Sequence, residues 1–197
     1  MQRVMIIGAH GQIARVVTRL LLEHADVALT LYLRRAQRLQ SLATHPRVTL
    51  VEGDARDVAQ LSAAMPGQDL VYANLSGDMA SQAKAIVAAM QHTGLHRLVF
   101  ISAMGIYAEV PGEKYRHILD PYRDSAAIVE ASGLEYTLLR PAWLNDEDIA
   151  AYGLTRKGEP FKAAHEVVSR RSVAEIVRAI CLDPALHVGE SLGVHRQ

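Results

Sequence analysis

Three small residues near the amino terminus have the spacing of a phosphate-binding turn. Gly8, Gly11 and Ala14 follow one another at intervals of three residues. Glycine lets the backbone turn tightly and approach a ligand without a Cβ in the way, and a small third residue lets the next helix pack closely. An apolar run precedes this turn and a helical pattern follows it. That context favours a dinucleotide pyrophosphate at a helix amino terminus over a turn that holds no ligand.

Two adjacent arginines follow the second apolar run. The run 27–33 continues as Arg34 and Arg35, without an acid. An acid at this place would bond the ribose 2′-hydroxyl of NAD, whereas guanidinium groups suit a 2′-phosphate. We therefore expect NADP(H) to be preferred over NAD(H). For either arginine the alternative is a solvated side chain at the start of the next helix.

Small and polar residues follow the third and fourth apolar runs. Asp54 can accept a hydrogen bond from an adenine amino group, or it can cap the next helix. Residues 73–77 are small enough for ribose and nicotinamide to lie close, and His10 either approaches the phosphates or faces solvent. From these residues we expect the dinucleotide to contact Gly8, Ala9, His10, Gly11, Gln12, Ile13, Arg34, Arg35, Asp54, Ala55, Ala73, Asn74 and Leu75.

Short apolar runs that alternate with amphipathic ones must position these residues. Strands are expected at 4–7, 27–33, 48–51, 69–73, 97–101 and 134–139. Helices are expected at 12–23, 36–43, 57–65, 78–92, 122–131 and 172–182, the third with an acidic cap at Asp57. Continuously apolar strands that alternate with helices predict the α/β class, as a Rossmann-type doubly wound parallel sheet.

The second half of the chain is less regular. Residues 104–119 are expected to form a loop, and 140–170 a small C-terminal lid region on the substrate side. A short strand is also expected near 190–194. Because no long linker interrupts the pattern, we expect 1–197 to be a single NAD(P)-binding domain.

Composition excludes several classes of function. Lys plus Arg and Asp plus Glu each total 21, so no basic excess points to nucleic acid. The apolar runs are too short for a membrane span, and no signal peptide is recognisable. One cysteine, Cys181, allows no internal disulfide and lies among apolar residues that predict burial. No metal site is expected, because the histidines lack metal-ligand spacing. These features predict a cytoplasmic protein.

Five segments together resemble the atypical short-chain dehydrogenase/reductases, in the NmrA-like or NAD(P)H-binding branch. They are 8–14, 53–55, 99–105, 132–141 and 168–174. The resemblance implies a Rossmann fold, NADP(H) as ligand, and a substrate site over the carboxyl edge of the sheet. It adds further residues expected near the nicotinamide end: Ser102, Ala103, Pro141, Ala142 and Trp143.

The resemblance departs from the family at the catalytic residues. Active members carry a serine after the fifth strand and Tyr-x-x-x-Lys on the next helix. The candidates here are Ser102 and Tyr122, but Ala126 stands at the lysine position. If Tyr107 is aligned with the family's motif, Ala103 stands at the position of the family serine. The alternative tyrosine, Tyr115, also lacks a lysine four residues later. A tyrosine without that lysine has a pKa of about 10 and is a poor base near neutral pH.

The segment after residue 140 leaves two alternatives open. Trp143 either stacks on a ring of cofactor or substrate or anchors the lid through apolar contacts. The acids in 145–148 either begin a helix or belong to the site. Ser169 and Arg170 are expected to act as a helix cap and a salt-bridge partner.

Three hypotheses of function follow. The first is an NADPH-dependent oxidoreductase that passes hydride to a flavin, a quinone or a small carbonyl compound without a Tyr–Lys pair. Relatives of the flavin reductase/biliverdin reductase B type resemble the chain in size and take their proton from solvent. The alternative is a non-catalytic NADP(H)-sensing module that regulates a protein partner. An epimerase of nucleotide sugars ranks last, because that chemistry relies on the missing pair.

Overall fold

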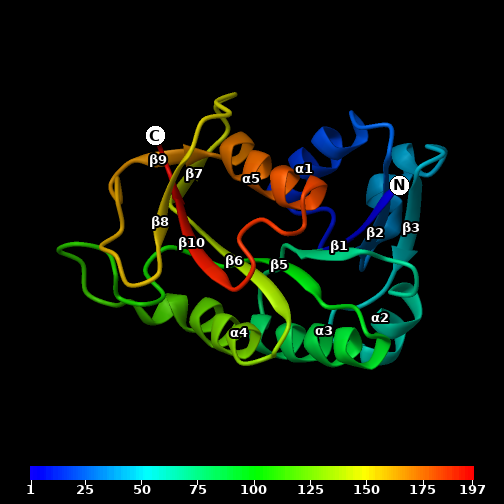
Figure 1. The fold of residues 1–197 in the computed structure, drawn as a ribbon, viewed down its shortest axis with the longest axis horizontal. Helices are drawn as coiled ribbons and strands as arrows, with labels where there is room; N and C mark the ends of the chain where they lie inside the picture. The colour runs from blue at the N-terminus through cyan, green and yellow to red at the C-terminus, as the bar shows by residue number, and fades with distance from the viewer.

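Eight strands form the central sheet of the computed structural model, which describes residues 1–197 (Figure 1). They are β1 (Gln2–Ile7), β2 (Val27–Leu33), β3 (Val48–Glu52), β4 (Leu70–Ala73), β5 (Arg97–Ile101), β6 (Glu135–Pro141), β8 (Gly153–Arg156) and β10 (Glu190–His195). Their order is β3-β2-β1-β4-β5-β6-β10-β8, and all neighbours are parallel except β10 and β8. This is the predicted doubly wound α/β sheet.

Helices cover both faces of the sheet (Figure 1). They are α1 (Gln12–Leu22), α2 (Val58–Ala64), α3 (Met79–Thr93), α4 (Asp120–Glu130) and α5 (Arg170–Leu182). On one face α1 packs beside α5, and on the other α2, α3 and α4 lie in a row. A separate apolar cluster fills each side. The chain winds outward in opposite directions from β1 and β4, so the crevice between their carboxyl ends is the place where such sheets bind ligands.

Residues 36–43 were expected to form a helix, and a helix of the 3₁₀ type is present there. The segment is a 3₁₀ helix, η1 (Ala36–Leu42), with non-helical angles at Leu39. Its first amide, that of Ala36, donates to the Glu52 carboxylate at 2.9 Å. Leu39 is buried in the core, and this anchoring of one side chain sets the kinked path of the segment.

The lid region is more ordered than its sequence pattern indicates. Within it lie β7 (Trp143–Asn145) and β8, and β7 pairs with β9 (Val167–Ser169) in a small second sheet. The strand expected near 190–194 is present as β10, between β6 and β8. Two glycines allow the close packing here. A Cβ on Gly153 would lie 2.3 Å from the His195 ring, and one on Gly193 would lie 2.4 Å from the Phe161 ring.

The acids after Trp143 do not begin a helix, so that interpretation was wrong. Residues 146–152 have no regular structure. Asp146 instead pairs with Arg170 at 2.9 Å. Ser169 caps α5 by accepting from the Ser172 amide at 2.9 Å, which confirms the expected roles of Ser169 and Arg170.

One ion pair is buried beneath the loop that follows β5. The Arg140 guanidinium is fully buried and is paired with Glu109, whose side chain is 7% exposed. Glu109 also accepts from the amides of Gly105, at 3.1 Å, and Tyr107, at 2.9 Å. The pair therefore fixes the 104–116 loop to β6.

Cys181 is fully buried in α5, as expected, and burial raises the pKa of its thiol to about 12. None of the helices has both the length and the apolar character that crossing a membrane requires.

Candidate functional site

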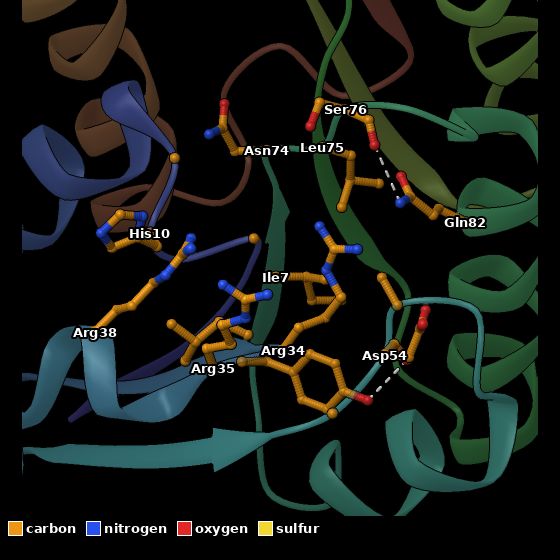
Figure 2. Close-up of a pocket in the computed structure, with 16 residues that line it drawn as sticks. Ile7, His10, Arg34, Arg35, Arg38, Asp54, Asn74, Leu75, Ser76 and Gln82 are labelled. Carbon is orange, nitrogen blue, oxygen red and sulfur yellow. Dashed lines mark hydrogen bonds between the residues drawn. The ribbon is translucent and has the colours of Figure 1, made fainter.

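A continuous groove runs along the carboxyl edge of the sheet. Its first part, the polar cleft, has a volume of about 440 Å³ over the ends of β1 to β4, and Figure 2 shows its lining. Its second part, the apolar cleft, has a volume of about 680 Å³ and lies over the ends of β5 and β6. The two parts share four lining residues: Gly11, Asn74, Leu75 and Ser76.

The glycine turn lies at the junction of the two clefts, beneath Asn74. The Gly8 amide donates to the Tyr32 carbonyl at 3.0 Å, and the Gly11 amide donates to the Gly8 carbonyl at 2.9 Å. Gly8 has a φ of +79°, and a Cβ there would lie 2.1 Å from the Asn74 carbonyl oxygen. A Cβ on Gly11 would lie 1.9 Å from Asn74 Nδ2. Both positions therefore require glycine as long as Asn74 covers the turn.

The amino terminus of α1 can accept an anion. Gly11 occupies the cap position without a side-chain hydrogen bond, and the first turn contains no acid. First-turn amides have no partner within their helix and stand at the positive end of its dipole. The arrangement suits a pyrophosphate.

Most residues expected to contact the dinucleotide line the groove. Those on the polar cleft are Gly8, His10, Gly11, Arg34, Arg35, Asp54, Ala55, Asn74 and Leu75. Those on the apolar cleft are Gln12, Ile13, Ser102, Ala103, Pro141, Ala142 and Trp143. Ala9 and Ala73 do not reach it, because both side chains are fully buried in the core. Their roles as contacts were inferred from adjacency in the sequence, which does not show the direction of a side chain.

Three arginines gather in the polar cleft. Figure 2 shows Arg34, Arg35 and Arg38 reaching it from the segment after β2. Sequence reasoning missed Arg38, because it lies within the expected helix and does not follow a strand directly. The carboxylate of Glu52, at the end of β3, is used by the Ala36 amide and does not line the cleft. The cleft therefore has three cations and one carboxylate, that of Asp54.

Asp54 is held by Arg56 and does not cap a helix. Arg56 donates to its carboxylate from Nη2 at 2.8 Å and from the backbone at 2.9 Å, which lowers the pKa of Asp54 to about 2. The cap of α2 is Asp57, as expected, which accepts from the Gln60 amide at 3.0 Å. The Tyr32 hydroxyl donates to the Asp54 carbonyl at 3.0 Å and fixes the position of this turn.

His10 lies on the rim of the polar cleft. Its pKa is lowered by partial burial and by the charges of Arg15 and Arg38. An anion bound beside His10 would raise this pKa again.

The apolar cleft is lined mostly by hydrophobic side chains. Among them are Ile101, Met104, Ile118, Leu119, Trp143 and Leu144. Trp143 is 54% exposed, and the Arg116 guanidinium lies 5.3 Å from the centroid of its ring. Sequence reasoning missed Met104, Arg116 and Ile118, because their loop has no periodic pattern that shows which side chains face inward.

Ser102 and Tyr122 both line the apolar cleft, but their hydroxyl groups are not paired. Ser102 Oγ donates to the backbone carbonyl of Tyr122 at 3.3 Å. Ala126, at the position of the family lysine, is fully buried in the core and does not line the cleft.

The two alternative tyrosines lie outside the apolar cleft. The Tyr107 hydroxyl donates to Glu130 at 2.7 Å, and the Tyr115 hydroxyl donates to Asp120 at 2.8 Å. The pKa of Tyr107 is raised, first of all by burial. Tyr122 is therefore the one tyrosine of the apolar cleft, and no lysine accompanies it.

The groove and its turn agree with the comparison to known families. Residues 8–184 match the NAD(P)H-binding family. The chain belongs to this family. This membership fits the resemblance to atypical short-chain dehydrogenase/reductases drawn from the sequence motifs.

Solved structures and a curated relative support the same assignment. A Rossmann-fold NAD(P)-binding family protein from Shigella flexneri is 42% identical, with a TM-score of 0.86 over 100% of this chain and 94% of that one. A short-chain dehydrogenase/reductase from Veillonella parvula DSM 2008, in complex with NADP, is 27% identical, with a TM-score of 0.88 over 99% of this chain and 94% of that one. YhfK of Bacillus subtilis (strain 168), named an uncharacterized sugar epimerase, is 28% identical over 161 residues, which are 74% of this chain and 73% of that protein.

Proposed function

We propose that the protein is an NADPH-dependent oxidoreductase that passes a hydride to a flavin, a quinone or a small carbonyl compound without a Tyr–Lys pair. The observation that carries the proposal is the asymmetry of the groove. One end has three arginines, and the other is an apolar cleft with one tyrosine and no lysine.

The residues of the polar cleft fit NADP(H). Arg34, Arg35 and Arg38 supply the positive charge that a 2′-phosphate requires, and phosphate is bound most strongly by such charge-assisted hydrogen bonds. The glycine turn and the start of α1 suit the pyrophosphate. The relative from Veillonella parvula, whose structure is a complex with NADP, supports this choice.

The residues of the apolar cleft suit an acceptor that needs little acid–base assistance. Bound NADPH supplies a hydride. A flavin or quinone takes that hydride on a conjugated ring system and can take its proton from water, so no Tyr–Lys pair is required. The cleft contributes orientation of the acceptor and exclusion of bulk water from the reacting groups. Where the hydride acceptor is a carbonyl compound, the Tyr122 hydroxyl is the group of this cleft that can donate a proton to the carbonyl oxygen.

Binding of the two dinucleotides tests the cofactor part. Arg34→Ala and Arg38→Ala should each weaken NADPH by about tenfold, because each removes a charged hydrogen-bond donor to phosphate, and should leave NADH unchanged. Arg19→Ala, at an exposed position near the end of α1, is the matched control and should change neither. Equal losses for both dinucleotides would show that these arginines are structural.

Turnover tests the reaction. Oxidation of NADPH is followed with FMN, riboflavin, menadione and a small aldehyde, at an acceptor concentration series. We expect turnover with at least one flavin or quinone. Tight NADPH binding without turnover of any of them would refute the reductase and favour the non-catalytic sensor, in which an NADP(H)-dependent complex with a protein partner should then be found.

A further inference from the structure

We infer that the apolar cleft takes an acceptor with two parts, a flat conjugated body and an anionic group, and that Arg116 binds the anionic group. The inference rests on the proposed function, because it names the class of acceptor for that same cleft. It makes Arg116 a specificity-determining residue.

The shape of the apolar cleft suits the flat conjugated part of the proposed acceptor. Pro141, Ala142 and Trp143 continue from the end of β6 along one part of the lining, and Ile118 and Leu119 belong to η2 (His117–Leu119), the short 3₁₀ helix that precedes α4. Trp143 keeps more than half of its surface exposed although it lines the cleft. An aromatic side chain with a free surface beside apolar neighbours offers a stacking partner to a planar ligand.

The positive charge of the apolar cleft suits the anionic group of the proposed acceptor. The lining of the cleft includes two cations, Arg116 and Arg170, and no carboxylate. Asp146 neutralises Arg170 through Nη1, at 2.9 Å, although Nε of this residue stays buried without a hydrogen-bond partner. Arg116 makes no ion pair and no side-chain hydrogen bond with the protein; its one polar contact is with the Trp143 ring. Its full charge is therefore available to a ligand.

The Trp143 ring also holds the guanidinium of Arg116 beside the cleft, with the guanidinium carbon 5.3 Å from the ring centroid. A cation–π contact uses the face of the ring as its partner and leaves the N–H groups of the guanidinium without hydrogen-bond acceptors. These groups are then available to a carboxylate, phosphate or sulfonate on the same ligand whose rings contact Trp143. The arrangement separates this cation from the three arginines of the polar cleft, which lie on the segment after β2.

Riboflavin and FMN test the inference, because they differ only by a terminal phosphate. The dissociation constant of each is measured from quenching of flavin fluorescence, with saturating NADP⁺ present so that the polar cleft is occupied. The wild-type protein should bind FMN about tenfold more tightly than riboflavin, the gain typical of one charge-assisted contact. Arg116→Gln should remove this preference by weakening FMN alone, and Arg116→Lys should keep part of it.

Lys114→Gln provides the matched control. Lys114 is an exposed cation on the same loop and lines a different hollow, so its removal should leave both flavins unaffected. Three results would each overturn the inference. They are equal affinities for the two flavins in the wild-type protein, absence of binding of either flavin, and an FMN preference that survives Arg116→Gln.

Turnover of the same two flavins separates this inference from the proposed function. An FMN preference that depends on Arg116, in a protein that oxidises NADPH with neither flavin, would support the anion site and refute the reductase. Reduction of both flavins with equal kcat/KM, unaffected by Arg116→Gln, would support the reductase and refute the anion site.

Discussion

Replacing Glu109 with glutamine tests the buried ion pair beneath the 104–116 loop. The substitution keeps the size of the side chain and removes its charge, so the fully buried guanidinium of Arg140 loses its counter-charge. Removal of one partner from a buried pair typically costs about 3 to 5 kcal/mol, because the remaining charge is left without compensation.

The remaining contacts of Arg140 place the expected loss at the lower end of that range. Its Nε donates to Ser191 Oγ at 3.1 Å, and its Nη2 donates to the Thr155 carbonyl at 3.3 Å. The rings of Tyr107 and Phe161 lie 5.0 and 5.8 Å from the guanidinium carbon. We therefore expect Glu109→Gln to lower the free energy of unfolding by about 3 kcal/mol. For a chain of this length that corresponds to a fall in Tm of about 7 °C.

Urea and thermal unfolding followed by circular dichroism measure this loss. Glu113→Gln, an exposed carboxylate on the same loop, is the control and should change the free energy of unfolding by less than about 0.5 kcal/mol. The double variant Glu109→Gln with Arg140→Met should be more stable than Glu109→Gln alone, because it no longer buries an unpaired charge. The reasoning would be refuted if the free energy of unfolding of Glu109→Gln lay within about 1 kcal/mol of the wild-type value. It would also be refuted if the double variant were less stable than Glu109→Gln.

Glu109→Gln should affect the binding of the two ligands differently. The two carboxylate oxygens of Glu109 accept from the amides of Gly105 and Tyr107, and glutamine keeps only one acceptor oxygen, so the substitution loosens the loop that carries Arg116. We expect weaker binding of FMN and unchanged binding of NADPH, because the three arginines expected to hold its 2′-phosphate lie on the polar cleft. Equal weakening of both ligands would mean that the whole fold, and not the loop, has been disturbed.

Four further positions in and near the groove give direct tests. Gly8→Ala should lower the free energy of unfolding by about 2 kcal/mol or more, because it combines a left-handed φ with contact against backbone. A Cβ at Gly11 would meet the flexible amide of Asn74 first and the Gly8 carbonyl oxygen only at 3.2 Å. Gly11→Ala should therefore cost less stability than Gly8→Ala, about 1 kcal/mol, yet weaken NADPH at least about tenfold; equal destabilisation of the two variants would contradict this. A phosphate bound beside His10 raises its lowered pKa, so binding takes up a proton and NADPH should bind more tightly as pH falls from about 8 to about 6. Calorimetry in buffers of different ionisation enthalpy should show that proton uptake, and it should be reduced in His10→Gln. Ala126→Lys should lower the free energy of unfolding by at least about 2 kcal/mol and should not improve carbonyl reduction, because the position is buried in the core; a stable variant with faster reduction would refute this.

The sequence was sufficient where local patterns decide the structure. The glycine turn, the alternation of strands and helices, and the Asp57 cap all depend on residues close together in the chain. Arg34 and Arg35 were found because they follow a strand directly, and the end of a parallel strand faces the ligand edge of the sheet.

Features that depend on distant partners could not be predicted in this way. The β8 strand exists because it pairs with β10, from the end of the chain. The directions of Ala9 and Ala73 are set by packing that no periodicity shows. Arg116 belongs to the site because Trp143, more than twenty residues later, lies beneath its guanidinium.

The position of Trp143 has a practical consequence. It is the only tryptophan of the chain, so all indole fluorescence of the protein arises on the wall of the apolar cleft. Its emission overlaps the absorption of reduced nicotinamide, and it is sensitive to a ring that stacks on it or to a change in the cation above it. The unlabelled protein thus carries its own optical reporter, in which arrival of the dinucleotide, arrival of the acceptor and departure of each can be followed in a single stopped-flow trace.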